Sequence, residues 1–467
     1  MKTFIYALRK FTLMQEKCKI GIVFLSPSSG ALGEPPKSEE LFKEREKRIM
    51  QKLNQLFPDI LFESYTVRNL EELSEALNKS RDVIGYVAFL LNSLYGLAKP
   101  IIDSDKPVIL IAETYGGAGD FLLDYNRARI ENKKVIGIVT RDIEDENLLK
   151  RYITYLYVIY KLHHSRILFI LSPGVRTLTR SEFPLSVDLY SYLKRIQSIF
   201  GITSIMLESG EFVQKYYNKV SDDEARKVAD NWIKMAKEVV EKDTKEIIKS
   251  AKLYLAMKNA IKDYNADVIA IDCITLYRNG FLDAWPCLGY MELIRRDEAI
   301  PVCEADAFSA ALLLLMKHLA NRPGFINDPS PDIIKGEIVY YHCFAPITPY
   351  GYGDQKVVPY TITPAHLGGK KASIYVEAPT GETVTVVGLS PEERIITIHT
   401  AEVVRNEYSE LACSTKIIGK ANVAAIINNY NWRAGWHRVL FYGDWRDQLR
   451  EVALLLGLRV IEEDKRD

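Results

Sequence analysis

The sequence predicts an α/β protein with two doubly wound, Rossmann-like α/β domains followed by a mainly-β, barrel-like C-terminal domain. Three observations predict this fold. Short β-branched runs alternate with amphipathic stretches from residue 19, the alternation restarts near residue 166, and strands separated only by turn residues follow residue 336. A chain of 467 residues also exceeds what one hydrophobic core usually supports. We therefore expect three domains, over residues 1–160, 161–335 and 336–467.

The first domain is predicted from five short runs typical of strands, of which the last three are continuous apolar runs suited to parallel strands covered on both faces. Two amphipathic helices are expected between the early strands, at 38–57 and 70–80. The runs are KIGIVFL (19–25), DILFESYTV (59–67), DVIGYVAFL (82–90), PVILIAET (107–114) and KVIGIVT (134–140).

The second domain follows a predicted helix at 151–165. Its expected strands are RILFILSPG (166–174), ITSIMLES (202–209), DVIAIDC (267–273) and IPVCEAD (300–306). Apolar residues at helical spacing predict helices at 186–201, within 221–264, near 287–298 and over 307–320.

The third domain is predicted to be all-β until its last segments. A final helix at 445–457 and a strand at 458–463 are expected to close the chain. The predicted strands are EIVYYHCFAP (337–346), KASIYVEAP (371–379), ETVTVVGLS (382–390), ERIITIHTAEVV (393–404), TKIIGKANVAAIINN (415–429) and HRVLFYG (437–443).

Composition excludes several classes of function. Lys plus Arg equals Asp plus Glu at 61 each, so no global charge recruits nucleic acid or an anionic membrane. The six cysteines form no CxxC pair and lack the density of a disulfide scaffold. No signal peptide and no run of about 18 apolar residues is recognisable. We expect a cytoplasmic enzyme with free thiols.

Glu304 and Asp306 lie where a buried strand ends and a helix begins. Carboxylates at that edge of an α/β sheet commonly face the ligand crevice. Asp306 has a second interpretation, because it can cap the helix that follows. Glu304 has no such role, so we assign it to the functional site.

Asp328 can return to the vicinity of Glu304. A helix over 307–320 carries the chain about 21 Å away at 1.5 Å per residue. The extended segment NRPGFIND, 321–328, can span about 26 Å back. An Asp before a proline is also a common turn residue, so reach alone does not assign Asp328 a function.

His437 begins a strongly apolar strand preceded by two tryptophans, Trp432 and Trp436. A histidine there is either a core residue or a ligand. Tryptophans favour a sugar site, because indole rings stack on the apolar faces of sugars. Trp285, Trp432 and Trp436 are therefore candidate substrate contacts.

Two further features compete for a function. ETYGGAGD (113–120) follows a strand but lacks a GxGxxG or GKS pattern, and a tight turn explains its glycines equally well. His342 neighbours Cys343 at a strand end, a spacing that does not suit a single zinc ion. We expect His342 to line the site.

Taken together, three segments are similar to the C-terminal half of the L-fucose isomerase family and, more loosely, to L-arabinose isomerases. The resemblance covers residues 267–467, and it is architectural over the first 260. VCEADAFSAALLLL resembles the acidic strand-to-helix motif, FIND the aspartate segment and NYNWRAGWHRVLFYGDW the C-terminal motif. It implies that Glu304, Asp328 and His437 bind the metal.

The resemblance further implies a metal-dependent aldose–ketose isomerase. Glu304 and Asp328 would move a proton between C1 and C2 through a cis-enediol, with His437 as a ligand. Two carboxylates and an imidazole suit Mn²⁺ or another divalent cation that leaves positions open for substrate oxygens. A homo-oligomer, a trimer or hexamer with the site near a subunit interface, is also implied.

Three alternatives stay open. Arg433 and Arg438, near His437, could hold the anionic group of a phosphorylated or sulfonated sugar. The chain could instead be a non-catalytic sugar-binding protein. The GGAG segment could belong to a nucleotide-dependent transferase.

Overall fold

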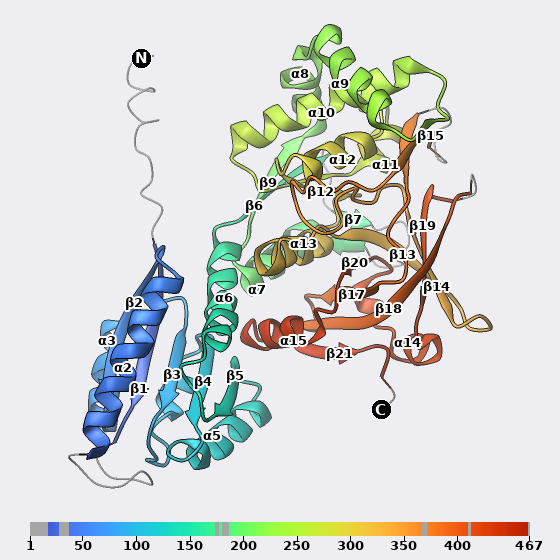
Figure 1. Cartoon of the computed structure of the whole chain (residues 1–467). Coiled ribbons are helices and arrows are strands. Elements are labelled where there is room, and N and C mark those ends of the chain that lie inside the picture. The colour runs from blue at the N-terminus through green and yellow to red at the C-terminus, as the bar shows by residue number, and fades with distance from the viewer. Residues whose placement is uncertain are drawn as a thin grey trace, which may run out of the picture. The chain divides into compact units, whose positions relative to one another are not determined.

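The computed structural model of the chain describes residues 17–27, 37–172, 177–179, 186–365, 371–409 and 412–465. Contacts divide the chain into two compact units, Met1–Tyr160 with Leu454–Gly457 and Lys161–Ala453 with Leu458–Asp467. Figure 1 labels the elements of both units. The division into three domains stays a prediction.

The first unit contains a five-stranded, all-parallel sheet with the order β2-β1-β3-β4-β5. This order is that of an open doubly wound sheet, and all five strands expected from the sequence are present. The strands are β1 (Cys18–Leu25), β2 (Ile60–Val67), β3 (Tyr86–Leu90), β4 (Val108–Glu113) and β5 (Val135–Thr140). The helices are α2 (Lys37–Leu56), α3 (Leu70–Lys79), α4 (Lys99–Ile102), α5 (Ala118–Ile130) and α6 (Glu146–His163).

The glycine-rich segment after β4 is a tight turn whose backbone amides are occupied. The Glu113 carboxylate accepts hydrogen bonds from the amides of Tyr115 and Gly116, at 2.7 and 2.6 Å. A Cβ atom on Gly117 would lie 2.2 Å from the Leu90 carbonyl oxygen. The Glu113 carboxylate already occupies backbone amides that a phosphate would otherwise bind, and Gly117 packs closely against Leu90 of β3. Packing of the turn therefore accounts for the GGAG segment without a bound phosphate.

The second unit begins with a four-stranded parallel sheet in the order β12-β11-β6-β9. Its strands are β6 (Arg166–Leu171), β9 (Thr203–Glu208), β11 (Val268–Ile271) and β12 (Ile300–Cys303). The helices of this region are α7 (Leu189–Phe200), α8 (Ser209–Lys215), α9 (Asp222–Met235), α10 (Thr244–Tyr264), α11 (Cys273–Arg278), α12 (Cys287–Arg295) and α13 (Ala307–Ala320). Two small sheets accompany them, formed by β7 (Thr177–Thr179) with β8 (Ser186–Asp188) and by β10 (Glu238–Val239), β15 (Tyr360–Pro364) and β16 (Ala372–Val376).

The C-terminal part of this unit is a closed barrel of six antiparallel strands in the order β17-β20-β13-β14-β19-β18, closed by pairing of β18 with β17. Its strands are β13 (Phe325–Asp332), β14 (Glu337–His342), β17 (Thr383–Ser390), β18 (Ile395–Glu407), β19 (Thr415–Lys420) and β20 (Arg438–Tyr442). β21 (Arg459–Glu462) adds to β18 in parallel, after helix α15 (Arg446–Leu455). Closure pairs the backbone N–H and C=O groups that the edge strands of an open sheet would leave unpaired.

One predicted strand is wrong in its second half. Residues 415–429 were expected to be extended throughout, but α14 (Val423–Asn429) follows β19. The Asn422 side chain accepts a hydrogen bond from the Ala425 amide and caps this helix. The cap and the helix-forming alanines outweigh the β-branched residues that favoured a strand.

A fully buried ionic network joins β20 to the last strand. Arg438 donates to Glu463 at 2.8 Å, and the other Glu463 oxygen lies 2.9 Å from His399 Nδ1. His399 Nε2 lies 3.0 Å from the Tyr340 hydroxyl. Arg438 also donates to the backbone oxygens of Gly435 and His437, at 2.8 and 3.1 Å. The network therefore fixes the backbone that carries His437.

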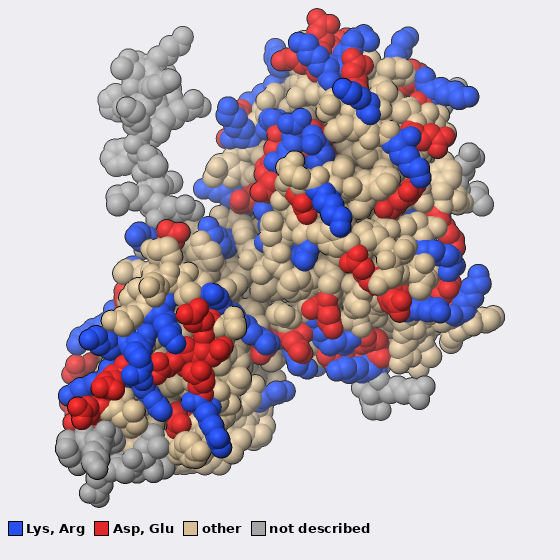
Figure 2. All heavy atoms as spheres, in the orientation of Figure 1, with Lys and Arg blue, Asp and Glu red and all other residues tan. Residues whose placement is uncertain are grey.

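Figure 2 shows basic and acidic side chains interspersed over the face in view, without a large patch of one sign. This distribution accords with the net charge of zero. Among the described residues, no helix combines the length and apolar character that crossing a membrane requires.

We predict that Glu463→Gln destabilises the second unit by about 3–5 kcal/mol, because it leaves the buried Arg438 charge uncompensated. All five tryptophans lie in this unit, so tryptophan fluorescence during urea unfolding measures its free energy of unfolding. The exposed pair Arg450 and Asp447 supplies the control. Asp447→Asn is expected to cost less than about 1 kcal/mol, and an equal cost for both variants would contradict the prediction.

We also predict acid sensitivity from the same carboxylate. Burial raises the pKa of Glu463, but Arg438 and His399 lower it further, to about 2 against an ordinary value of 4.5. Its stabilising contribution is complete above pH 4.5 and is lost as the pH falls toward 2. The free energy of unfolding of the wild type should fall across this range more steeply than that of Glu463→Gln. Parallel pH profiles would show that another group controls acid unfolding.

Candidate functional site

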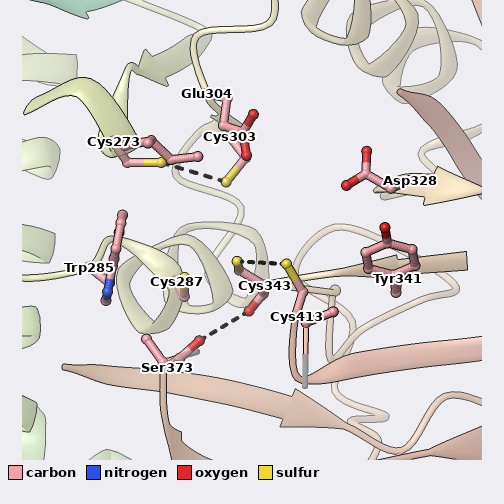
Figure 3. A pocket seen from close by; sticks show the side chains of 13 residues that line it. Cys273, Trp285, Cys287, Cys303, Glu304, Asp328, Tyr341, Cys343, Ser373 and Cys413 are labelled. Carbon is pink, nitrogen blue, oxygen red and sulfur yellow. Dashed lines mark hydrogen bonds between the residues drawn. The ribbon is translucent and has the colours of Figure 1, made fainter. Parts of the chain in front are cut away.

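Glu304 occupies a strained turn between β12 and α13. Glu304 and Ala305 both have left-handed backbone, with φ of 55° and 50°. Non-glycine residues at positive φ are uncommon and cost of order 1–3 kcal/mol each, and they cluster at functional sites. The Ala305 amide is held by the Ile271 carbonyl at 3.0 Å. This turn places Glu304 in the wall of a cavity (Figure 3).

Asp306 performs the capping role expected for it and a second role as well. Its Oδ1 accepts hydrogen bonds from the amides of Phe308 and Ser309, at 3.0 and 3.3 Å, and so caps α13. Its Oδ2 lies 3.0 Å from His437 Nδ1. With Asp306 as the acceptor, Nδ1 of His437 carries the proton and Nε2 presents its lone pair to the site.

Asp328 and His342 enter from two paired barrel strands. Asp328 lies on β13, opposite Tyr341 of β14, and His342 is the last residue of β14. Asn327 secures the neighbouring strand, because its side-chain amide donates to the Arg438 carbonyl of β20 at 3.2 Å. The barrel thus brings Asp328, His342 and His437 to one place, opposite the turn that carries Glu304.

Three contacts among these four side chains have lengths suited to ligands of one cation. Glu304 Oε1 lies 3.5 Å from His342 Nε2, and Glu304 Oε2 lies 3.7 Å from His437 Nε2. Asp328 Oδ1 lies 3.4 Å from His437 Nε2. Two ligands about 2.1 Å from one ion are separated by about 3.0 Å at a right angle and about 4.2 Å when opposite. The observed separations fall within this interval.

Glu304, His342 and His437 form the tightest set. One ligand atom from each lies within 4.8 Å of the other two, and no other such group of three His, Cys, Asp or Glu residues occurs in the described part of the chain. Asp328 stands beside this set. The residues present therefore fit a divalent cation, with two imidazoles and one carboxylate as its nearest donors.

The surroundings of this set favour positive charge. Burial alone lowers the pKa of His342, but the hydrogen bond to Glu304 and the charges of Cys413, Glu304 and Asp328 raise it to about 10. A buried imidazole that holds a proton this strongly reports a negative potential. A divalent cation would meet the same potential.

The cavity beside these groups has a volume of about 210 Å³. Figure 3 shows Glu304, Asp328 and Tyr341 on one part of its wall and Trp285 on another. Five thiols also line it, and burial raises the pKa of the Cys287 thiol to about 12. The lining residues are Cys273, Ile274, Trp285, Cys287, Cys303, Glu304, Asp328, Tyr341, Cys343, Ala365, Ser373, Ala412 and Cys413.

The residues predicted to contact substrate do not all line the cavity. Trp285 lines the cavity and stacks on Tyr277, with ring centroids 4.9 Å apart. Trp436 lies behind the wall, where its indole donates to the Pro329 carbonyl at 3.1 Å and its ring meets the edge of Tyr341. Trp436 therefore supports a residue of the lining.

Trp432 and Arg433 do not line the cavity. Trp432 is 53% exposed, and the Arg433 guanidinium lies 5.2 Å from its ring and 3.5 Å from Glu393. Their role in substrate binding stays a prediction. Arg438 is fully buried against Glu463 and Tyr430, so it is not presented to a ligand.

Sequence reasoning did not identify the closeness of His342 to Glu304 or the convergence of the thiols. The position of His342 follows from the pairing of β14 with β13 and β19, which places a strand end at the site. The available signal was a histidine at the end of an apolar strand. The thiols come from separate segments and carry no spacing signal.

Comparison with known proteins adds no functional assignment. No family model and no curated protein match the chain. One similar solved structure is the periplasmic binding protein component of the arabinose ABC transporter from Shewanella sp. ANA-3, bound to alpha and beta-L-arabinofuranose. It shares 11% identity, over 58% of this chain and 82% of that chain, with a TM-score of 0.16. A score this low carries no argument, so function rests on the site.

We predict that Asp306→Asn weakens Mn²⁺ binding by about 10–100-fold, because His437 loses the acceptor that orients it. Free Mn²⁺ measured by electron paramagnetic resonance during a titration gives the affinity. Asp243→Asn is the matched control, since Asp243 caps α10 through the Lys245 amide. An unchanged affinity in Asp306→Asn would mean that His437 needs no orienting carboxylate.

Proposed function

We propose that this protein is a metal-dependent aldose–ketose isomerase of the L-fucose/L-arabinose isomerase type. The observation that carries the proposal is that Glu304 and Asp328, which line one cavity, both lie against His437 Nε2. These residues come from the end of β12, from β13 and from the approach to β20. They are the residues that the sequence resemblance nominates, and the first and the last are 133 positions apart in the chain.

Glu304, His342 and His437 would hold the cation, with Asp328 beside them. We propose Mn²⁺ or a similar divalent ion, because carboxylate and imidazole donors without thiolate suit such ions. When bound, the cation supplies a Lewis acid for neighbouring carbonyl and hydroxyl oxygens of a sugar. In this set His342 takes the ligand position that the sequence resemblance gave to Asp328.

Glu304 and Asp328 are the proposed acid and base. Both line the cavity, so both can reach a bound substrate. Isomerisation removes the proton at C2 of an aldose and delivers a proton to C1, and a carboxylate within hydrogen-bond reach can perform each transfer. Asp306 holds the His437 ring, which in turn contacts both carboxylates at 3.7 and 3.4 Å. The chain thus positions the two bases through one imidazole.

The lining favours a neutral sugar over an anionic one. None of the described residues that line the cavity is Lys or Arg. The two arginines considered for an anionic group are engaged elsewhere, Arg433 with Glu393 and Arg438 with Glu463. Trp285 offers an aromatic face of the kind that sugars use. A homo-oligomer and a cytoplasmic location remain expectations from the sequence.

A second candidate function follows from the same donors. Two histidines and one carboxylate with open positions are also the ligand set of non-haem Fe(II) oxygenases. Asp328, a second carboxylate 3.4 Å from His437, favours the isomerase. Oxygen consumption by the Fe(II)-loaded protein, measured with an oxygen electrode in the presence of aldoses, would favour the oxygenase instead.

We predict metal-dependent aldose–ketose conversion in purified protein stripped with EDTA and then supplied with Mn²⁺. Incubation with a panel of neutral aldoses in D₂O, followed by NMR, should show ketose formation with deuterium at C1 of the ketose and, through the reverse reaction, at C2 of the aldose. Glu304→Gln and Asp328→Asn should each lower the rate by about 100-fold or more, because each removes a proton-transferring group.

Asp332→Asn is the matched control for this experiment. Asp332 ends the same strand as Asp328, and its carboxylate caps a turn through the amides of Ile334 and Lys335. Its rate should stay within about twofold of the wild type, since it does not line the cavity. Exchange that persists in both site variants, or that needs no metal, would refute the assigned roles.

A further inference from the structure

Five of the six cysteines line one cavity, although they lie far apart in the sequence. Cys273 and Cys287 begin helices α11 and α12, Cys303 ends β12, Cys343 follows β14 and Cys413 precedes β19. None of the five forms a disulfide bond. The proposed metal centre uses none of them, so this cluster calls for its own explanation.

The thiols form two close pairs. Cys343 Sγ and Cys413 Sγ are 3.2 Å apart, while Cys273 Sγ and Cys303 Sγ are 3.9 Å apart (Figure 3). No three of the described thiols come close enough to one another to hold an ion as a set. A closed zinc site of three or four cysteines is therefore not formed by the described residues, and pairwise chemistry remains.

The Cys343–Cys413 pair lies at a junction of two barrel strands. β14 and β19 pair antiparallel with His342 opposite Thr415, so each thiol sits just beyond the paired region. The pairing of β14 with β19 holds both strands at this end, and the two sulfurs face each other across it. Oxidation needs only a local approach of two sulfurs that are already in contact.

A cation lies beside Cys413. The Lys416 ammonium donates to the Cys413 carbonyl at 2.7 Å and to the Ser409 carbonyl at 3.4 Å, and Lys416 is 9% exposed. Reactive cysteines sit in electropositive surroundings of this kind, and this contact distinguishes Cys413 from Cys343. Cys273 and Cys303 have no such cation among their contacts in the described structure.

We propose that Cys413 and Cys343 are a site of reversible oxidation by a hydroperoxide, with Cys413 as the attacking thiol and Cys343 as the resolving thiol. The Cys413 thiolate attacks the peroxide, the O–O bond breaks, and a sulfenic acid and an alcohol (or water) form. Cys343 sulfur then attacks Cys413 sulfur. The S–O bond breaks and water leaves with the Cys343 proton. Two thiols are oxidised and one peroxide is reduced.

The disulfide would act on the proposed metal centre through His342, which precedes Cys343 in the chain. Drawing Cys343 toward Cys413 displaces the end of β14, and His342 lies 3.5 Å from Glu304. Oxidation should therefore weaken cation binding. This consequence rests on the proposed function, whereas the oxidation itself needs neither metal nor substrate.

The test uses metal-free full-length protein treated with a small molar excess of hydrogen peroxide. Titratable thiols in denaturant should fall from six to four per chain, because two are joined, and dithiothreitol should restore them. Trypsin cuts at Lys335 and Lys356 around Cys343 and at Arg405 and Lys416 around Cys413. Mass spectrometry should find these two peptides cross-linked and two hydrogens lighter.

Variants separate the two roles. In Cys343→Ser, dimedone should trap a sulfenic acid on Cys413, and in Cys413→Ser no cross-link should form. Cys18→Ser and Cys273→Ser are controls that should still give the Cys343–Cys413 cross-link. Circular dichroism shows whether each variant is folded, and treatment of the wild type alone already decides whether the cross-link forms.

Three results would overturn the proposal: six thiols that survive peroxide, a cross-link between other cysteines, or no dimedone adduct in Cys343→Ser. The Mn²⁺ affinity of the oxidised protein is measured separately. A disulfide without any loss of affinity would overturn the coupling to His342 and leave the oxidation site standing. Failure of isomerase activity would affect neither thiol measurement.

Discussion

The hydrogen bond between Asp306 and His437 joins the two halves of the second unit at the point where the site is formed. Asp306 belongs to the strand-to-helix junction of the parallel sheet, and His437 belongs to the approach to a barrel strand. Asp306 is already fixed by the amides of α13, so its remaining oxygen has a defined position. The imidazole that it holds lies against both Glu304 and Asp328. A displacement of this one contact would move the His437 ring and so change its distances to Glu304 and Asp328.

The surrounding structure stabilises the unfavourable backbone conformation of this site. Two consecutive left-handed residues, Glu304 and Ala305, are unfavourable in isolation. They persist because β12 is paired on one side of the turn and α13 is capped on the other. On the barrel side, Arg438 ties the backbone of His437 to Glu463, which follows β21. The functional groups are thus placed by backbone that has little freedom to relax.

Sequence patterns predicted the parallel strands, the helix over 307–320 and the β-rich C-terminal part, because periodicity and apolar runs are local signals. The same reasoning brought Asp328 near Glu304 through the length of a helix and an extended return. It failed for Val423–Asn429, where a side-chain cap decided the structure. It also did not identify His342 as a candidate ligand or predict the gathering of the thiols, because these depend on strand register around a closed barrel. Register is set by contacts between residues far apart in the chain, which one sequence read locally does not reveal.

The register of β13 against β20 also determines when the centre can exist. Asn327 and Arg438, which hold these strands together, are 111 residues apart in the chain. Closing so long a loop costs conformational entropy, and pairing between residues far apart in the chain slows folding. Asp328 and His437 flank this pairing and become neighbours only when it is made. A chain that has built its parallel sheets but has not paired these strands cannot bring His437 to Glu304, so the proposed cation site depends on completion of the barrel.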